Sequence, residues 1–170
     1  DLIPRPPPPA LPPLPRLAVQ SFWESHGHSA AAEDIAGYVG SKLTEEVFRQ
    51  ELLDEDNIFQ WLHYNGQPAG YSKIILHSAN GYIAPKNVTK LERLYFLKEF
   101  HGLGLAQQLF EHNRLMALQA GQTGIWLNTW TGNHRAGALY QKLGFAIVGP
   151  NDFKISERHS NPNYVMYLEW

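Results

Sequence analysis

The stretch that decides the fold is His101-Gly102-Leu103-Gly104-Leu105-Ala106-Gln107. It lies between a strand-like run at residues 88–97 and an amphipathic run at residues 105–120, so we expect a strand, a tight glycine turn and a helix in succession. Backbone N–H groups at such a turn, together with the start of the helix, can hold phosphate oxygens. The stretch fits neither the dinucleotide motif G-x-G-x-x-G, because Gln107 replaces the third glycine, nor the Walker A motif. On its own it fits a phosphate site and a tight connection without a ligand equally well.

Hydrophobic periodicity predicts both helices and strands around this unit. Helical spacing predicts helices at residues 17–23, 30–43, 44–54, 105–120 and 133–143. Alternating or apolar runs predict strands at residues 58–64, 71–76, 88–97, 124–130, 145–148 and 164–169. Asn65-Gly66 between the first two strands predicts a β-hairpin, and Thr44 is the expected N-cap of the third helix.

Composition and charge narrow the class of protein. The 170 residues, 44% of them hydrophobic and 18% charged, are enough for one globular domain with an apolar core. Sixteen acidic against fourteen basic residues give a net charge of −2, which disfavours a nucleic-acid partner. The chain has no cysteine for a disulfide or a thiolate, no metal-ligand spacing between His26 and His28, and no apolar run near the roughly 18 residues of a membrane span. We therefore expect a cytoplasmic protein without a metal or a membrane partner.

Prolines concentrate at the start of the chain, where residues 1–16 hold eight of the twelve. We divide the chain into this proline-rich N-terminal segment, residues 1–16, and a single domain, residues 17–170. Several Pro-x-x-Pro spacings are compatible with a polyproline II ligand for an SH3-like groove. The favoured interpretation is an irregular edge segment leading into a helix with proline in its first turn, because proline cannot supply the donors of a regular central strand.

A second motif, N-x-x-A-x-x-x-Y-x-x-x-G-F, follows the glycine turn at Asn133, Ala136, Tyr140, Gly144 and Phe145. It resembles a signature of the GNAT N-acetyltransferase superfamily. Residues 101–106 resemble the acyl-CoA pyrophosphate motif of that superfamily, Q/R-x-x-G-x-G/A, with His101 in place of Gln or Arg. The side-chain contact of the motif is therefore not carried over to His101, whereas backbone N–H groups need no particular side chain. The order of the expected helices and strands extends the resemblance over residues 17–170.

The resemblance implies an α/β (α+β) fold for a single acetyltransferase domain. A mixed, mostly antiparallel sheet is expected, flanked by helices and splayed between its fourth and fifth strands. The first strand is expected to be distorted or missing, because the proline run occupies its place. Three runs are similar to a bacterial branch that includes spermine/spermidine acetyltransferases: residues 22–27, 91–95 and 126–130. Exposed sheet edges make a homodimer a further option.

Acetyl-CoA is the co-substrate that the resemblance implies. Its pyrophosphate is expected on N–H groups at the helix start. Its pantetheine amides are expected on the free backbone of the splayed strand, where one N–H polarises the thioester carbonyl. The expected cofactor-binding residues are Leu94, Tyr95, Phe96, Gly102, Leu103, Gly104, Leu105, Ala106, Gln107, Asn133 and Tyr140.

Two residues are candidates for catalysis. Tyr140 lies two helical turns after Asn133, so both can face one ligand, and the resemblance makes Tyr140 the general acid for the CoA thiolate. Its alternative role is that of a core tyrosine with a satisfied hydroxyl. Glu92 either accepts the amine proton, directly or through water, or is a solvated ion-pair partner of Arg93 or Lys90.

The expected function is acetyl transfer from acetyl-CoA to a primary amine of a small molecule such as a polyamine. The alternatives are a protein or peptide N-acetyltransferase, a non-catalytic acyl-CoA sensor, against which Tyr140 argues, and an adaptor recruited through residues 1–16. Acidic residues between positions 45 and 56 either attract a polyamine or form a solvated helix face. The solvated face is the favoured explanation.

Overall fold

The computed structural model describes residues 2–4 and 13–170. The proline run at residues 5–12, and with it the core of the alternative polyproline II ligand, lies outside the described residues. The helices are α1 (Pro13–His26), α2 (Ala32–Lys42), α3 (Glu45–Leu52), the short 3-10 helix η1 (Lys98–Phe100), α4 (Leu105–Gln119) and α5 (His134–Lys142). The strands are β1 (Leu2–Pro4), β2 (Asn57–Tyr64), β3 (Gln67–Ile75), β4 (Thr89–Phe96), β5 (Gly124–Trp130), β6 (Ala146–Ser156) and β7 (His159–Glu169). Every helix and strand predicted from periodicity is present, which confirms those assignments.

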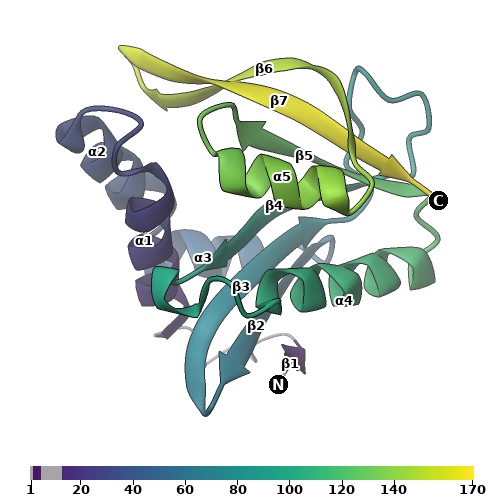
Figure 1. Cartoon of the computed structure of the whole chain (residues 1–170), viewed down its shortest axis with the longest axis horizontal. Coiled ribbons are helices and arrows are strands. Elements are labelled where there is room, and N and C mark those ends of the chain that lie inside the picture. Colours follow the sequence, from purple (N-terminus) through teal and green to yellow (C-terminus); the bar gives the residue numbers. More distant parts are fainter. Residues whose placement is uncertain (1, 5–12) are drawn as a thin grey trace.

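One sheet forms the centre of the described structure, with strand order β1-β2-β3-β4-β5-β7-β6. Neighbouring strands are antiparallel except β4 and β5, which run parallel. In Figure 1, α4 and α5 lie in front of the sheet, α3 lies behind it, and α1 and α2 lie at its left. This mixed, mostly antiparallel sheet flanked by helices confirms the predicted fold class.

The proline-rich start contributes to both the sheet and the first helix. Leu2–Pro4 pair with residues 60–62 of β2 at the sheet edge, where a missing N–H is tolerated. The first strand, expected to be distorted or missing, is reduced to these three residues. Helix α1 begins at Pro13, earlier than the predicted start, and holds Pro13 and Pro15 in its first turn, where N–H groups have no helical partner. The described residues agree with the prediction at both ends of this segment, in the edge strand Leu2–Pro4 and in a helix with proline in its first turn.

Strands β4 and β5 diverge soon after they meet. Only Thr89 and Lys90 of β4 pair with β5. Beyond them, a bulge at Glu92 shifts the register of β4 against β3, and such a bulge bends a strand. Residues 91–96 therefore keep one backbone edge free toward the gap. The predicted splay between the fourth and fifth strands is confirmed.

The two long hairpins differ in their turns and in their sequence signals. Asn65 and Gly66 between β2 and β3 have positive φ angles of 50° and 78°, as a type I′ turn requires, and the predicted hairpin is confirmed. The β6–β7 hairpin is longer than predicted, because each strand has eleven residues. Its outer residues are mostly polar, and the alternation around Phe153 and Ile155 is too short to predict a strand. The turn of this hairpin is tied to α2 by an ion pair of 3.0 Å between Arg158 and Asp34.

Apolar clusters hold the helices against the sheet. Phe48 of α3 packs edge-on against Phe59 of β2, with ring centroids 5.5 Å apart. Phe110 of α4 and Tyr140 of α5 each pack on Phe145 with centroids 5.5 Å apart. Burying one such ring contributes roughly 1.5–3 kcal/mol. The second cluster therefore fixes α5, and with it Tyr140, beside the gap between β4 and β5.

Candidate active site

A cleft of about 800 Å³ opens along the gap between β4 and β5. Its walls come from the end of α1, from β4 and β5, from the turn before α4, from α5 and from the β6–β7 hairpin. Its volume lies within the range of ligand sites, roughly 300–1,000 Å³. The two sequence motifs, which are separated by β5, thus meet in one cavity.

Most of the predicted site residues lie at this cleft. Those that line it are Glu92, Leu94, Tyr95, Phe96, Gly102, Gly104, Leu105, Ala106, Gln107, Asn133 and Tyr140. The exception is Leu103, whose side chain is 49% exposed and does not line the cleft. Its side chain points into solvent because the backbone reverses direction between two glycines with positive φ. Any contribution of Leu103 is therefore restricted to its backbone.

The glycine turn, residues 102–107, presents backbone N–H groups to the cleft. Gly102 and Gly104 have φ angles of 81° and 75°, a region that side chains other than glycine rarely adopt. The N–H of Gln108 donates to the carbonyl of Gly104, so the N–H groups of residues 105–107 have no helical acceptor. The Nε2–H of His101 donates to the carbonyl of Phe96 at 3.0 Å and braces the turn against β4. His101 thus has a structural contact in place of the motif's side-chain role.

Tyr140 lies on α5 with its ring buried and lines the cleft. Burial raises the pKa of its hydroxyl, so Tyr140 keeps its proton at neutral pH. The hydroxyl forms no hydrogen bond with another residue of the described chain, unlike the satisfied core tyrosine that was the alternative. Asn133 caps α5 because its Oδ1 accepts a hydrogen bond of 3.1 Å from the N–H of Ala136. The cap fixes the side chain and leaves its amide NH₂ group for another acceptor.

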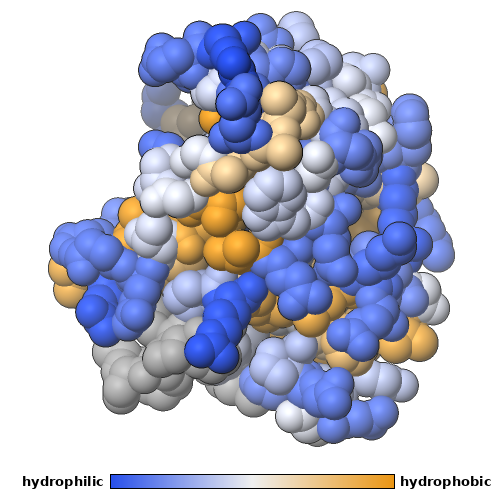
Figure 2. Space-filling view, turned by 90° about the vertical axis from the view of Figure 1, so that its left-hand side faces the viewer, coloured by the Kyte–Doolittle hydropathy of each residue, from blue (hydrophilic) through white to orange (hydrophobic). Residues whose placement is uncertain are grey.

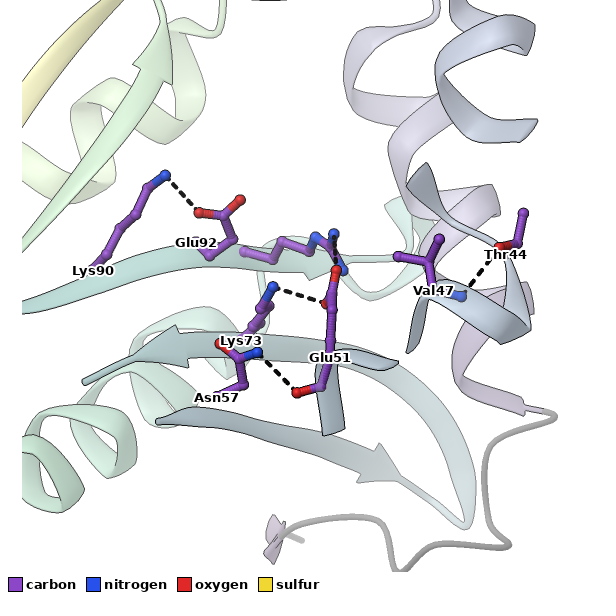
Figure 3. Close-up of polar contacts among 8 residues, drawn as sticks. Thr44, Val47, Glu51, Asn57, Lys73, Lys90 and Glu92 are labelled. Atoms are coloured by element: carbon purple, nitrogen blue, oxygen red, sulfur yellow. Dashed lines mark hydrogen bonds and ion pairs between the residues drawn. The ribbon is translucent and has the colours of Figure 1, made fainter. Parts of the chain in front are cut away.

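Glu92, the bulge residue of β4, is ion-paired with Lys90 at 2.6 Å (Figure 3). Lys90 and Arg93 were the two partners considered for Glu92 from the sequence. In the structure Lys90 is the partner, and Arg93 is paired with the carboxylate of Glu51 instead. Burial alone raises the pKa of Glu92, but the positive charges of Lys90, Lys73 and Arg93 outweigh it and hold this pKa below its ordinary value. Glu92 is therefore ionised at neutral pH and lies at the cleft.

A buried ionic network lies beneath this part of β4 (Figure 3). Glu51 of α3 pairs with Lys73 of β3 at 2.8 Å and with Arg93 of β4 at 3.4 Å, and the two cationic side chains are only 7% and 9% exposed. The backbone carbonyl of Glu51 also accepts a hydrogen bond of 2.8 Å from Asn57. None of the acidic residues between positions 45 and 56 lines the cleft. This acidic group therefore anchors α3 through Glu51 and adds no side chain to the cleft.

Aromatic and imidazole rings form one wall of the cleft, called the aromatic wall below: His26, His28, Tyr95, Trp130 and Phe153. Burial, and to a smaller extent the charge of His28, lowers the pKa of His26 to about 4, so its ring is neutral at pH 7. Its Nδ1 atom is buried without a hydrogen-bond partner in the described chain. On the side of α1 and α2, hydrophobic residues form a central band framed by hydrophilic ones (Figure 2). The sequence analysis considered His26 and His28 only as metal ligands and missed this wall.

Charged side chains at the cleft are mostly cationic. In the described chain, four Lys or Arg side chains line it (Lys90, Lys98, Arg135 and Lys142) together with two carboxylates, Glu24 and Glu92. Glu24 accepts a hydrogen bond of 3.0 Å from the backbone N–H of Lys98. The sequence analysis missed the cations of α5, although their position beside the second motif is a usable signal. An excess of positive charge beside free N–H groups suits an anionic, phosphate-bearing ligand.

Metal-binding groups and helices able to span a membrane are both absent from the described residues. No group of three or more His, Asp or Glu side chains that could hold a metal ion occurs in residues 2–4 and 13–170. Within the same ranges, no helix is both long and apolar enough to cross a membrane.

Comparison with known proteins agrees with the geometry of the cleft. Residues 3–145 match the model of the acetyltransferase (GNAT) family. An uncharacterized N-acetyltransferase of Mycobacterium bovis is 29% identical over 156 residues, which cover 92% of this chain and 95% of the relative. Another, from Lactobacillus delbrueckii subsp. lactis, is 25% identical over 147 residues, 86% of this chain and 85% of the relative.

Solved structures share the whole fold. The PaiA N-acetyltransferase of Thermoplasma acidophilum, solved in complex with coenzyme A, superposes with a TM-score of 0.80 at 18% identity, covering 100% of this chain and 99% of that one. The family match and the meeting of both motifs in one cleft show that this chain belongs to the acetyltransferase (GNAT) family, enzymes that use acetyl-CoA as the acyl donor.

Proposed function

We propose that this protein transfers the acetyl group of acetyl-CoA to a primary amine of a small molecule bound in the cleft. The observation that carries the proposal is the convergence of the glycine turn, the free edge of β4 and Tyr140 on one cavity. The turn supplies N–H groups for the pyrophosphate, and the free backbone of Leu94–Phe96 suits the pantetheine amides as it would suit an added strand. Arg135 and Lys142 add positive charge suited to phosphate groups.

Tyr140 is the proposed general acid. The amine nitrogen bonds to the acetyl carbon, the carbon–sulfur bond breaks, and the Tyr140 hydroxyl supplies the proton that the leaving sulfur needs. Solvent then returns a proton to the tyrosine. Tyr140 is protonated at neutral pH, as a tyrosine with a raised pKa must be, so the proton is present when the sulfur leaves. General acid catalysis of this kind contributes roughly 10²–10⁴ in rate.

Glu92 is the proposed destination of the amine proton, directly or through water. Its low pKa makes it a weak base, and its negative charge at neutral pH favours the approach of an ammonium group. The ion pair with Lys90 offsets part of that charge. Glu92 thus contributes mainly by attracting the amine and by accepting a proton that solvent carries away.

Two classes of acceptor amine are compatible with the proposal. The similarity to spermine/spermidine acetyltransferases makes a polyamine the first candidate, and a protein or peptide amine is the alternative. The acidic residues between positions 45 and 56, which were the sequence-based support for a polyamine, do not line the cleft. A sensor without catalysis would have no need for a protonated tyrosine at the cavity.

The test is Tyr140→Phe, which keeps the ring and its packing on Phe145 but removes the acid. We expect kcat, measured as thiol release from acetyl-CoA with an amine panel, to fall by about 10²-fold or more. The Kd for acetyl-CoA and the melting temperature should change little. Tyr164→Phe is the control, because Tyr164 is exposed and lies outside the cleft. Near-normal kcat in the Tyr140 variant would exclude its role as the acid, and activity that merely tracks the folded fraction would show a structural tyrosine.

A further inference from the structure

We infer that the acceptor is a primary amine that carries an aromatic ring on a short flexible linker, and not a polyamine. This inference rests on the proposed function and adds the class of its substrate. It comes from the aromatic wall, in which no residue belongs to α4 or α5. Tyr95 takes part in both sides of the cleft, with its backbone on the free edge of β4 and its ring in the wall.

The rings of the wall are arranged around His26. Tyr95 and Trp130 present edge-to-face contacts to it at centroid distances of 5.9 and 6.3 Å, and Phe153 lies 6.3 Å away. His28 contacts Trp130 at 5.4 Å. These separations are the ones that aromatic pairs prefer. The four wall residues other than His28 are only partly buried and His28 is exposed, so ring surface remains for a ligand.

The Trp130 ring packs directly on the backbone of Gly132. A Cβ atom at Gly132 would lie 2.4 Å from the Cζ2 atom of the Trp130 ring, so the indole lies directly against a residue without a side chain. A ring held in this way presents its surface without first losing side-chain freedom. The wall is therefore a pre-formed platform for a flat ligand group.

The charges at the cleft disfavour a polycation. Four cationic side chains and two carboxylates line it in the described chain. Glu24 accepts the Lys98 N–H, and Lys90 offsets part of the charge of Glu92. A polyamine would bring its second and third ammonium groups into a cleft in which cationic side chains outnumber carboxylates. A monoamine brings one positive charge, which aromatic faces can stabilise.

The wall also offers a polar contact for that single amine. The Nδ1 atom of His26 is buried, has no partner in the described chain and belongs to a neutral ring, in whose Nε2–H tautomer it is a hydrogen-bond acceptor suited to an amine N–H. Glu92 supplies negative charge at the same cleft. One amine and one ring thus match the wall. A free arylalkylamine and a peptide with an N-terminal aromatic residue share this chemistry.

The experiment compares acceptors of matched shape with the whole chain and saturating acetyl-CoA. The acceptors are 2-phenylethylamine, 2-cyclohexylethylamine, spermidine and the dipeptide amide Phe-Ala-NH₂. We expect kcat/KM for phenylethylamine to exceed that for the cyclohexyl analogue by about threefold to tenfold, and that for spermidine by at least about tenfold. The comparison of kcat/KM for the dipeptide amide with that for phenylethylamine distinguishes a peptide with an N-terminal aromatic residue from a free arylalkylamine.

Two variants assign the preference to the wall. Trp130→Leu keeps apolar bulk and removes the ring face, so the advantage of the phenyl over the cyclohexyl acceptor should fall to about one. Trp130→Phe should restore most of it. In Trp130→Leu the KM for phenylethylamine should rise and kcat should change less, because a binding contact is removed while Tyr140 stays.

Two outcomes contradict the inference, and a third contradicts the proposed function. Higher kcat/KM for spermidine than for phenylethylamine overturns it and leaves the proposed function standing. Equal rates for the phenyl and cyclohexyl acceptors, unchanged by Trp130→Leu, also overturn it. Binding of acetyl-CoA without turnover of any amine contradicts the proposed function itself.

Discussion

The glycine turn brings five residues of a six-residue stretch, Gly102 and residues 104–107, to the cleft, whereas the aromatic wall assembles side chains from positions 26 to 153. The turn depends on two glycines with positive φ and on the start of one helix. The wall depends on α1, β4, β5 and β6 being held in place by contacts elsewhere in the molecule. The proposed cofactor side is therefore local in sequence, and the proposed acceptor side is set by tertiary structure.

The largest expected effect concerns the buried ion pairs of Glu51, which lie away from the aromatic wall and hold α3 against β3 and β4. Glu51→Gln leaves Lys73 and Arg93, both nearly buried, without their counter-charge, so we expect the free energy of unfolding to fall by about 3–5 kcal/mol. Denaturant titration measures this. Glu45→Gln on the same helix is the control, because the exposed pair of Glu45 with Arg49 is worth about 0–1 kcal/mol. Equal losses in the two variants would mean that the buried network does not anchor α3.

The next prediction concerns the imidazole at the centre of the wall. The pKa of His26 is lowered to about 4 in the folded protein from 6.5, so between these values the unfolded chain binds more protons than the folded one. Stability should be constant above pH 6.5 and fall as the pH drops toward 4, by up to about 3 kcal/mol. His26→Phe should remove most of this slope, whereas His134→Gln, at an exposed position, should keep it. The same slope in wild type and in His26→Phe would rule out a buried neutral imidazole.

A change in the glycine turn should affect cofactor binding and leave the wall intact. Gly104→Glu places a side chain at φ 75° and a negative charge beside the N–H groups, so the Kd for acetyl-CoA should rise at least about tenfold, or about 1.4 kcal/mol. Gly66→Glu is the matched control, because Gly66 has a φ of 78°, open space around it and no place at the cleft. Calorimetry distinguishes the two. A tenfold loss in both variants would show that backbone strain, and not the turn, governs binding.

The same contrast explains what the sequence could predict. Asn65-Gly66, the Thr44 cap and the two glycines of the turn act within a few residues, so the amino-acid sequence alone identifies each of them. Thr44 does cap α3, by accepting a hydrogen bond of 3.3 Å from the N–H of Val47. Tyr140 and Asn133 are found because a spaced motif preserves a helix face. For these features, local chemistry and the fold give the same answer.

The remaining features depend on contacts between residues far apart in the chain. The partner of Glu92 is undecided from sequence, because the bulge in β4 decides whether it faces Lys90 or Arg93. The outer part of the β6–β7 hairpin is mostly polar, with an alternation too short to predict a strand, and it is the part that carries Phe153 to the wall. No local pattern connects Phe153 with His26. The acceptor side is for this reason the part that sequence reasoning missed.

The smallest expected effect comes from releasing a carboxylate on the acceptor side. Lys90→Met removes the counter-charge of Glu92 but keeps an apolar contact on Trp126, over whose ring the Lys90 ammonium lies at 5.1 Å. The free carboxylate should raise kcat/KM for spermidine by about threefold, since a partly exposed ion pair is worth under about 1 kcal/mol, and raise that for the singly charged phenylethylamine less.

The pH dependence supplies a second readout of the same variant. Without Lys90 the pKa of Glu92 rises, so the acid limb of the spermidine kcat/KM profile should move to higher pH, because a protonated Glu92 neither attracts nor deprotonates an amine. Lys86→Met, at an exposed position outside the cleft, should change neither the rate nor the profile. An unchanged spermidine rate and profile in Lys90→Met would mean that the acceptor does not sense the charge of Glu92. The pairing of that carboxylate could then no longer explain a preference for a single amine over a polycation.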